Sequence, residues 1–310
     1  IAKLFIAGTI PLILSCIAQF YFQLYGPFEI FKGAIVWFQR PLTETNQNLT
    51  GLFSNPNYTG AWMTMVWPLS IVLLKENLRK KEFLKAKIMF LIIVTITCSI
   101  LLTNSRNAWA GFLISIPFLF GKKSLNWYLP ILFLLIIFIF SSFLPLFPNE
   151  IREFSSNLIP LNIQNKIIEI TLNLDSYPRL EIWRNAIQFI FEKPFFGWGA
   201  STFPLLYEQK SGIWNDHAHN LFLELSISYG LIVSILIFFI FINILIRSFL
   251  SIFLAKGRNS IVDKGWWIAG FVFFLTHLYD ILIFDGRINF ASWIFLIGLK
   301  NTFKKDPPLI

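Results

Sequence analysis

Charged residues are scarce in this chain of 310 residues, and their scarcity argues against a soluble fold. Only 14% of the residues are charged, whereas 55% are hydrophobic and 18% are aromatic. Soluble proteins carry about 25% charged residues. Cysteine is also scarce, and Cys16 and Cys98 both lie inside apolar runs. No disulfide framework is therefore predicted.

Long apolar runs make up much of the chain. Several approach or exceed the ~18–20 residues that cross a bilayer core, and we expect about eight spans. They are the ranges 4–22, 58–74, 88–103, 108–120, 127–147, 221–246, 266–284 and 288–299. Because the chain begins at Ile1 inside an apolar run, without signal-peptide features, we interpret it as a C-terminal portion that lacks its first helices. The predicted fold class is an all-α, polytopic membrane helix bundle.

Basic residues set the predicted orientation. The segment Lys75–Lys87 contains six Lys and Arg residues, and the positive-inside rule places it in the cytoplasm. Residues 148–220 then form one large loop on the outer side, the periplasm of a bacterium. Since the net charge of +9 is concentrated in inner loops, we do not expect nucleic-acid binding. Residues 1–310 are predicted to form a single integral-membrane domain in the inner membrane.

The second half of the outer loop contains the most distinctive polar segment, Arg179–Gly230. Apolar residues recur at helical spacing over residues 183–191. Pro194 stops the predicted helix, and Gly197-Trp198-Gly199 provides a turn. The segment closes on Asp216-His217-Ala218-His219-Asn220, directly before an apolar run. Two of the three histidines therefore lie where a polar loop enters the membrane.

Three features of this segment occur in a recognisable order: an Arg-x-x-x-Trp helix, a Pro-x-x-Gly-x-Gly turn and a His-Asn-x-x-Leu-Glu ending. Together they resemble the O-antigen ligase and polymerase superfamily. Members are multi-pass bacterial enzymes that transfer glycans from undecaprenyl-pyrophosphate carriers. The resemblance implies a GT-C-like helix bundle and a metal-independent, cofactor-free transfer with inversion at the anomeric carbon.

Two arginines are candidate contacts for the pyrophosphate. Arg106 lies between two apolar spans near the outer boundary, where it either snorkels, caps a helix or binds an anion. Arg179 begins the loop helix and is either a solvated arginine or a second anion contact. The planar guanidinium matches phosphate oxygens, and the resemblance favours that interpretation for both residues. Arg184 lies about 140° around the helix from Arg179, so we expect it to point away.

His219 is the strongest candidate for catalysis. A histidine near the membrane surface suits proton transfer or contact with a phosphate. Alternatively it caps the following helix, although Asn220 or Asp216 can fill that role. His217 is less attractive, because positions i and i+2 point differently and the resemblance involves the histidine before asparagine.

Acidic and amide side chains complete the candidate site. Glu224 lies one helical turn beyond Asn220 and either pairs with an arginine or takes part in catalysis. Asp280 or Asp285 resembles a late acidic position of the superfamily, and the choice between them stays open. Asn57 is expected to shape the outer entrance to the span 58–74.

A metal site at His217-x-His219 is a weaker alternative. It would need a further ligand such as Asp216 or His277, and the spacing matches none of the common zinc signatures. The chain also lacks an Asp-x-Asp motif. We therefore predict no metal.

These features predict an O-antigen ligase-like membrane glycosyltransferase that acts on the periplasmic face. Its donor would be an undecaprenyl-pyrophosphate-linked glycan, and its acceptor a hydroxyl of lipid A-core or a similar molecule. A growing polymer end or a protein side chain is an alternative acceptor. A glycolipid transporter would more often show paired half-repeats or broken helices. A scaffold subunit would not explain the Arg/His/Asp set.

Overall fold

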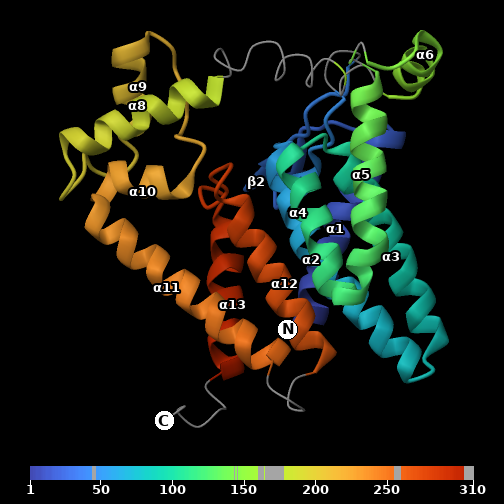
Figure 1. Ribbon diagram of the computed structural model, residues 1–310. Helices are drawn as coiled ribbons and strands as arrows, with labels where there is room; N and C mark the ends of the chain where they lie inside the picture. The colour runs from blue at the N-terminus through green and yellow to red at the C-terminus, as the bar shows by residue number, and fades with distance from the viewer. Residues whose placement is uncertain are drawn as a thin grey trace.

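The computed structural model describes residues 1–43, 47–142, 144, 146–159, 164, 178–254 and 260–303. This part of the chain is mostly helical, as predicted. Its α-helices are α1 (Ala2–Tyr21), α2 (Pro56–Arg79), α3 (Phe83–Leu102), α4 (Arg106–Phe120), α5 (Leu125–Ser141), α6 (Asn149–Leu158), α8 (Pro178–Glu192), α9 (Phe203–Ser211), α10 (Leu221–Tyr229), α11 (Leu231–Phe249), α12 (Ile261–Thr276) and α13 (Gly286–Phe303). In Figure 1, α1–α5 form one side, α12 and α13 lie in the middle, and α8–α11 form the other side.

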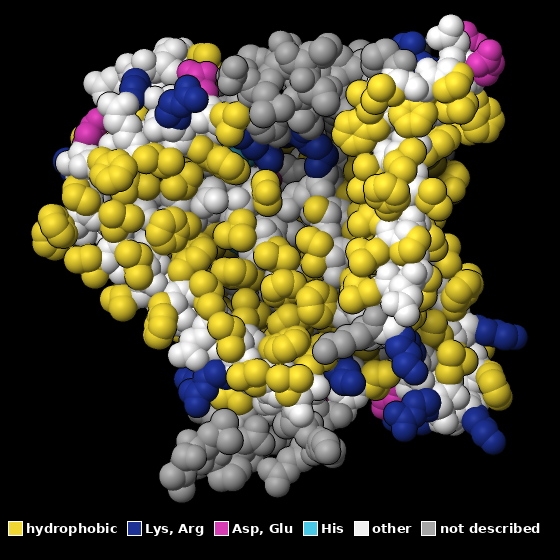
Figure 2. All heavy atoms as spheres, in the orientation of Figure 1, with side chains coloured by type: hydrophobic (Ala, Val, Ile, Leu, Met, Phe, Trp, Pro, Cys, Tyr) yellow, Lys and Arg dark blue, Asp and Glu magenta, His cyan; other side chains and the backbone are white. Residues whose placement is uncertain are grey.

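Several helices have the length and composition of membrane spans. Those long and apolar enough to cross a bilayer are α1, α3 and α11 together with its π-helical extension Leu250–Leu254, and α5 is a shorter apolar helix. Figure 2 shows hydrophobic side chains across the middle of one face, with Lys and Arg gathered at its lower edge. Charged side chains of both signs lie along the upper edge. This banding is consistent with a membrane helix bundle.

Helix α2 lies at the centre of the bundle, in contact with α1, α3, α4 and α12. Its Met63, Met65 and Leu69 side chains are fully buried. A glycine brings α4 close, since a Cβ added at Gly60 would lie 2.6 Å from the Cβ of Ala108. Small residues at such contacts drive helix packing in a bilayer, where the hydrophobic effect contributes little between helices.

Two predicted spans have different bounds in the structure. The range 221–246 divides at Gly230, whose φ of 86° separates α10 from α11. A Cβ at Gly230 would lie 2.1 Å from the carbonyl oxygen of Phe195, so only glycine fits there. The range 266–284 is helical only as far as Thr276, and a loop follows until α13 begins at Gly286.

The loop between α1 and α2 contains a short antiparallel hairpin that the sequence did not predict. Its strands are β1 (Phe28–Ile30) and β2 (Ile35–Trp37), with Glu29 opposite Val36. The rings of Phe28 and Trp37 stack with their centroids 5.3 Å apart. The fold is therefore all-α except for this hairpin in the described part of the chain.

The predicted outer loop 148–220 contains α6, α8 and α9, and its residues 160–163 and 165–177 lie outside the described ranges. Helices α8 and α9 pack against α10. Buried apolar side chains form the core of this lobe: Ile182, Ala186, Phe189, Ile190, Phe203, Tyr207, Ala218 and Ile227. The turn after α8 is fixed to the lobe, because the N–H of Trp198 donates to Ile227 (2.7 Å) and that of Leu231 donates to Pro194 (2.8 Å). The lobe thereby holds α10 and the histidine loop before it.

Candidate functional site

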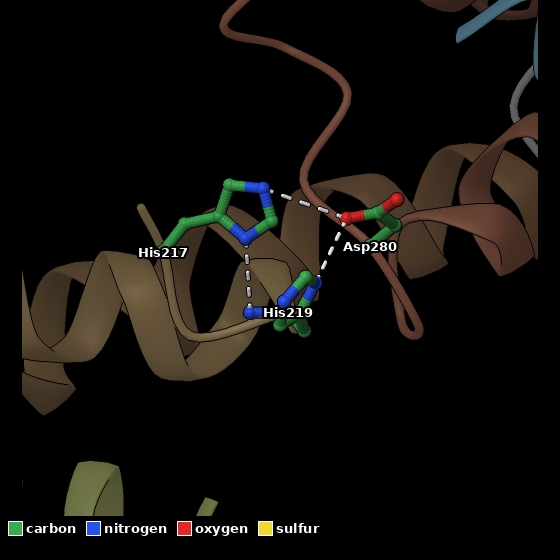
Figure 3. A group of neighbouring side chains, drawn as sticks. All are labelled: His217, His219 and Asp280. Atoms are coloured by element: carbon green, nitrogen blue, oxygen red, sulfur yellow. Dashed lines mark hydrogen bonds and ion pairs between the residues drawn. The ribbon is translucent and has the colours of Figure 1, made fainter. Parts of the chain in front are cut away.

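Two histidines and an aspartate from distant parts of the chain meet at one end of the bundle (Figure 3). His217 and His219 lie between α9 and α10, and Asp280 lies in the loop after α12. His219 Nδ1 is 3.1 Å from Asp280 Oδ1, and His217 Nε2 is 3.6 Å from the same oxygen. These three residues are termed the His–Asp cluster.

Asn220 joins the histidine loop to the loop that carries the aspartate. Its side-chain amide donates to the carbonyl oxygen of Leu278 (2.9 Å). Its Oδ1 accepts from the N–H of Leu223 (3.1 Å), as the N-cap of α10. Because Asn220 caps the helix, the ring of His219 is not needed for capping and contacts Asp280 instead.

Glu224 shapes the backbone between the two histidines. Its side chain is buried, and Oε2 accepts a hydrogen bond from the N–H of Ala218 (2.9 Å). Burial raises the pKa of this carboxyl, although the Ala218 bond and the nearby His219 oppose the rise. The structure therefore places Glu224 as a support of the histidine loop, and it shows no arginine partner for Glu224 among the described residues.

Hydrogen bonds define which ring nitrogens carry protons. His217 Nδ1 accepts from the backbone N–H of His219 (3.3 Å), so the proton of neutral His217 lies on Nε2 and faces Asp280. Burial lowers the pKa of His217, which favours this neutral form. Burial alone would raise the pKa of Asp280, but the hydrogen bond from His219 and the electrostatic effect of the two neighbouring imidazoles outweigh it and lower the pKa.

An ionised Asp280 determines the role that His219 can play. A carboxylate only accepts hydrogen bonds, so His219 donates to it from Nδ1. The lone pair on His219 Nε2 is then left to accept a proton. Since the side chain of His219 is 24% exposed and that of Asp280 only 4%, the pair has the arrangement of a general base held by a buried carboxylate.

Asp280 has two further partners. Asn57 Nδ2 donates to Oδ2 (2.8 Å), and the backbone N–H of Ile281 donates to Oδ1 (2.9 Å). Ser105 Oγ in turn donates to Asn57 Oδ1 (2.9 Å). A buried charge needs such partners to offset its loss of hydration. The structure therefore brings Asn57 into direct contact with the His–Asp cluster.

Arg106 is the first residue of α4, and it is exposed. Both of its neighbours bind near the cluster: Ser105 reaches it through Asn57, and Asn107 donates from its amide to the carbonyl oxygen of Thr276 (2.8 Å). A helix start also offers unpaired N–H groups and the positive end of the helix dipole. Arg106 thus lies where an anion next to the cluster would be favoured.

Arg179 lies in the first turn of α8 and is half-buried. Trp183, one turn further on, contacts Tyr279, with ring centroids 6.3 Å apart. Residues four apart share a helix face, so Arg179 lies on the side of α8 that faces the Asp280 loop. Arg184 is exposed, which agrees with its predicted outward position.

Asp280 contacts the histidines, whereas Asp285 forms an ion pair with Arg287. Asp285 Oδ2 is 2.6 Å from Arg287 Nη2. Arg287 also covers the ring of Phe53 at 4.1 Å and donates to the carbonyl oxygen of Leu52 (3.2 Å). This pair joins the start of α13 to the turn before α2, so Asp285 has a structural place in the fold.

The cluster also has the composition of a metal site, with one ligand atom of each residue within 4.8 Å of the others. The residue that joins the histidines is Asp280, not Asp216 or His277 as the sequence suggested. A metal would need the Nε2 lone pair of His217. That nitrogen carries the proton, because Nδ1 accepts from a backbone N–H. The hydrogen bonds therefore suit proton transfer better than metal binding.

An apolar cavity of about 340 Å³ adjoins the cluster, lined by residues of α10, α11, α12 and α13. Phe241, Phe274 and Trp293 lie in its wall. Two further lining residues, Leu221 and His277, are joined by a backbone hydrogen bond of 2.9 Å. Because Leu221 follows the histidine loop directly, the cavity begins where that loop ends. Its lining suits an apolar chain.

Sequence reasoning undervalued His217 and did not include Ser105. The argument that positions i and i+2 point differently did not hold here, because the φ of 51° at His219 bends the chain. The two imidazole rings consequently lie 4.3 Å apart and face one carboxylate. The signal available for Ser105 was its place directly before Arg106, because serine at the start of an apolar run is a typical N-cap.

Residues 88–238 match the family model described as O-antigen ligase. This range contains Arg106, Arg179 and His219, whereas Asn57 and Asp280 lie outside it. A stretch of 203 residues is 26% identical to the ComP-specific O-oligosaccharyltransferase of Acinetobacter baylyi, and it covers 63% of this chain and 35% of that relative. The chain thus spans about a third (35%) of the length of the curated relative that it matches.

Proposed function

We propose that the chain is an integral membrane glycosyltransferase, because residues 88–238 match the family model described as O-antigen ligase and several helices are long and apolar enough to cross a bilayer. It moves a glycan from an undecaprenyl-pyrophosphate donor to an acceptor hydroxyl on the periplasmic face of the bacterial inner membrane. The observation that supports this best is the contact between Asp280 and His219, which leaves Nε2 of the imidazole available for an acceptor proton.

The transfer is a single displacement at the anomeric carbon. His219 takes the proton of the acceptor hydroxyl while its oxygen bonds to that carbon, and Asp280 stabilises the imidazolium that forms. The bond from the anomeric carbon to the pyrophosphate oxygen breaks on the opposite face, which gives inversion. Arg106 and Arg179 hold the leaving pyrophosphate as its negative charge develops. In this mechanism the arginines neutralise the negative charge of the leaving group, a role that a metal fills in other enzymes.

The apolar cavity supports a lipid-linked donor. It lies between α10, α11, α12 and α13, of which α11 is long and apolar enough to cross a bilayer, and it begins at Leu221, two residues after His219. A polyprenyl segment in this cavity would place the attached pyrophosphate near the His–Asp cluster. The cavity is therefore where we place the first isoprene units of the donor.

The acceptor defines two candidate functions. A sugar of lipid A-core or a similar molecule is supported by the match to the O-antigen ligase model. A protein side chain is supported by the identity to a relative named an O-oligosaccharyltransferase. Analysis of a deletion strain separates these functions from a polymerase. Loss of a ligase leaves polymer on the carrier lipid, loss of a polymerase leaves single repeats, and loss of a protein ligase leaves an unmodified protein.

The experiment that tests the activity uses purified protein in lipid vesicles. Glycan transfer and movement of the donor between leaflets are measured in the same preparation. We expect His219→Asn to lower transfer by roughly 10²–10⁴-fold, the range for general acid–base groups. Asp216→Asn, in the same loop but outside the cluster, should remain near the wild-type rate. Lipid movement without transfer would show a transporter instead.

The orientation has a separate test. In a background without Cys16 and Cys98, a cysteine at Ser211 should react with an impermeant reagent added to the periplasm. A cysteine at Ser260 should not react. The reverse pattern would place the His–Asp cluster in the cytoplasm and contradict the proposal.

A further inference from the structure

A hydrogen-bonded chain joins the start of α4 to the His–Asp cluster. Ser105 donates to Asn57 (2.9 Å), and Asn57 donates to Asp280 (2.8 Å). Ser105 is 4% exposed and Asp280 3% exposed, so water competes little for these bonds. The three residues are termed the polar chain. The mechanism above gives Ser105 no role.

The carboxylate of Asp280 fixes the direction of each bond in the polar chain. Because a carboxylate only accepts, Asn57 has to turn its amide nitrogen toward Asp280 and its oxygen toward Ser105. Ser105 then has to donate its hydroxyl proton to Asn57. Its lone pairs remain to accept from the N–H of Ala108 (3.4 Å), as the N-cap of α4. One hydroxyl thus both begins α4 and orients the amide of Asn57.

The helix packing also supports this contact. Asn55 caps α2 by accepting from the backbone N–H of Asn57 (2.8 Å), which leaves the Asn57 side chain available. Gly60 lies one turn further along α2. A Cβ there would lie 2.6 Å from Ala108 Cβ and 3.3 Å from Ser105 Cβ. Glycine at this position lets α2 and α4 approach closely enough for Asn57 and Ser105 to bond.

The same end of α4 carries the anion-binding candidate. Arg106 follows Ser105 directly, and Asn107 contacts Thr276 at the end of α12. A shift of the first turn of α4 would therefore move Ser105 relative to Asn57. It would act on the polar chain at the end opposite the histidines.

We propose that Ser105 and Asn57 are positioning residues for the Asp280 carboxylate. They hold it in the orientation in which Oδ1 faces His219. An anion bound at Arg106 stabilises this orientation, because it fixes the helix start that Ser105 caps. Donor binding and orientation of the base are thereby coupled. This inference rests on the proposed function, in which Arg106 holds the pyrophosphate of the donor.

The test reads the histidine tautomers directly. The chain has three histidines, so ¹⁵N ring signals from histidine-labelled protein in lipid nanodiscs can be assigned by single substitutions. In the wild type, we expect the proton of His219 on Nδ1, with a larger share of this tautomer after addition of inorganic pyrophosphate. In Ser105→Ala, we expect mixed tautomers that no longer respond to pyrophosphate. Ser105→Thr keeps the hydroxyl and should restore the wild-type spectrum.

A matched control separates orientation from helix capping. Ser260 caps α12 and accepts from the N–H of Asp263 (3.2 Å). Ser260→Ala should lower the melting temperature about as much as Ser105→Ala, without changing the His219 signals. In the transfer assay, Ser105→Ala should lower kcat about five- to tenfold, the range for losing one hydrogen bond, with KM unchanged. Asn57→Leu should change the His219 tautomers as well, and it replaces Ser105→Ala in the test if that variant does not fold.

Wild-type tautomers and a wild-type response to pyrophosphate in Ser105→Ala and Asn57→Leu would overturn the inference. A shift of the His219 tautomers in Ser260→Ala would also overturn it. The spectra are recorded without turnover, so they also separate the two proposals. Altered tautomers in a protein that transfers no glycan would support the polar chain and contradict the proposed function.

Discussion

Replacing Asp280 with asparagine should remove the negative charge of the cluster and keep its shape. The N–H of Ile281 donates to Oδ1, so the amide oxygen of the new side chain should occupy that position and its NH₂ group should face Asn57. Asn57 can then rotate its amide to accept, because the Ser105 hydroxyl accepts as well as donates. We therefore expect Asp280→Asn to fold with His219 still hydrogen-bonded.

The expected loss of activity is electrostatic. Two unit charges 3.1 Å apart, the distance from His219 to Asp280, interact by about 5 kcal/mol at an effective dielectric constant of ~20. Solvent weakens this value, because the side chain of His219 is 24% exposed. One factor of ten in rate corresponds to about 1.4 kcal/mol. We expect turnover by Asp280→Asn to fall by roughly 10²–10⁴-fold, with little change in KM for the donor.

A double substitution tests whether charge is the cause. Asn57→Asp with Asp280→Asn returns a carboxylate one hydrogen bond further from His219. At a separation of about 6 Å, the interaction is about 3 kcal/mol. The double variant should therefore be faster than Asp280→Asn by roughly ten- to a hundredfold, whereas Asn57→Asp alone should be slow because two carboxylates meet.

Turnover is measured in vesicles as glycosylated acceptor formed, and the melting temperature of each variant confirms the fold. Full turnover by Asp280→Asn would refute the assignment of Asp280 as the partner of the base. A double variant no faster than the single one would refute the electrostatic explanation.

Three further outcomes are expected. Arg106→Ala and Arg179→Ala should each strongly reduce transfer at near-normal protein abundance. The corresponding lysine variants should keep only part of the transfer activity, because lysine cannot form the two parallel hydrogen bonds of a guanidinium. Arg184→Ala is the control, and full activity in Arg106→Lys would argue for charge alone. Added zinc ions should not raise transfer and a chelator should not lower it, because the His217 Nε2 that a metal would need carries a proton. Activation by zinc, or loss of transfer on chelation, would contradict the tautomer assignment. Burial raises the pKa of Glu224 above 4.5, so the folded state binds more protons than the unfolded state just above pH 4.5, and stability falls as pH rises through that window. Glu224→Gln should therefore raise the melting temperature at pH 7 but not at pH 4, and equal shifts at both would rule out the charge as the cause.

Hydropathy predicted where the helices lie but not where each one ends. Every predicted span contains a helix, because lipid-soluble runs of this length leave the backbone few alternatives. The end of the predicted span 266–284 is not helical, because α12 stops at Thr276. Ile281 and Leu282 are apolar and fully buried, yet they lie in the loop that carries Asp280. Hydropathy registers burial and does not distinguish a buried loop from a helix inside a bilayer.

Helix α8 shows that apolar spacing predicts a helix but does not identify which of its faces is buried. Residues 183–191 have apolar side chains around much of the helix, and the spacing suggested a buried face that included Ile187 and Phe191. The structure buries Ala186 and Ile190 of this pattern. It also buries Ile182 and Phe189, and it leaves Ile187 45% and Phe191 73% exposed. A helix with several apolar faces carries no sequence signal for which one its neighbours cover.

The candidate site was predictable in part. The histidine loop follows from a local motif, because its position depends on nearby turns and a helix start, whereas the roles of both arginines stay predictions. The contact of Asn57 with Asp280 joins residues 223 positions apart. It depends on how α2 and α12 pack, and nothing in the local sequence at either residue indicates it. The same packing decides between Asp280 and Asp285.

The break at Gly230 has a consequence for how this protein tolerates different membranes. Helix α11 and its extension contain 24 residues, or about 36 Å of helix, against a hydrocarbon core of about 30 Å. A helix this long tilts, and its tilt changes with bilayer thickness. Helix α10, however, is held by its own lobe and by the bond from Asn220 to Leu278. The bond from Leu231 to Pro194 fixes the first residue of α11 to the same lobe. A change of tilt therefore acts on this junction, so that turnover should differ between lipids of short and long acyl chains.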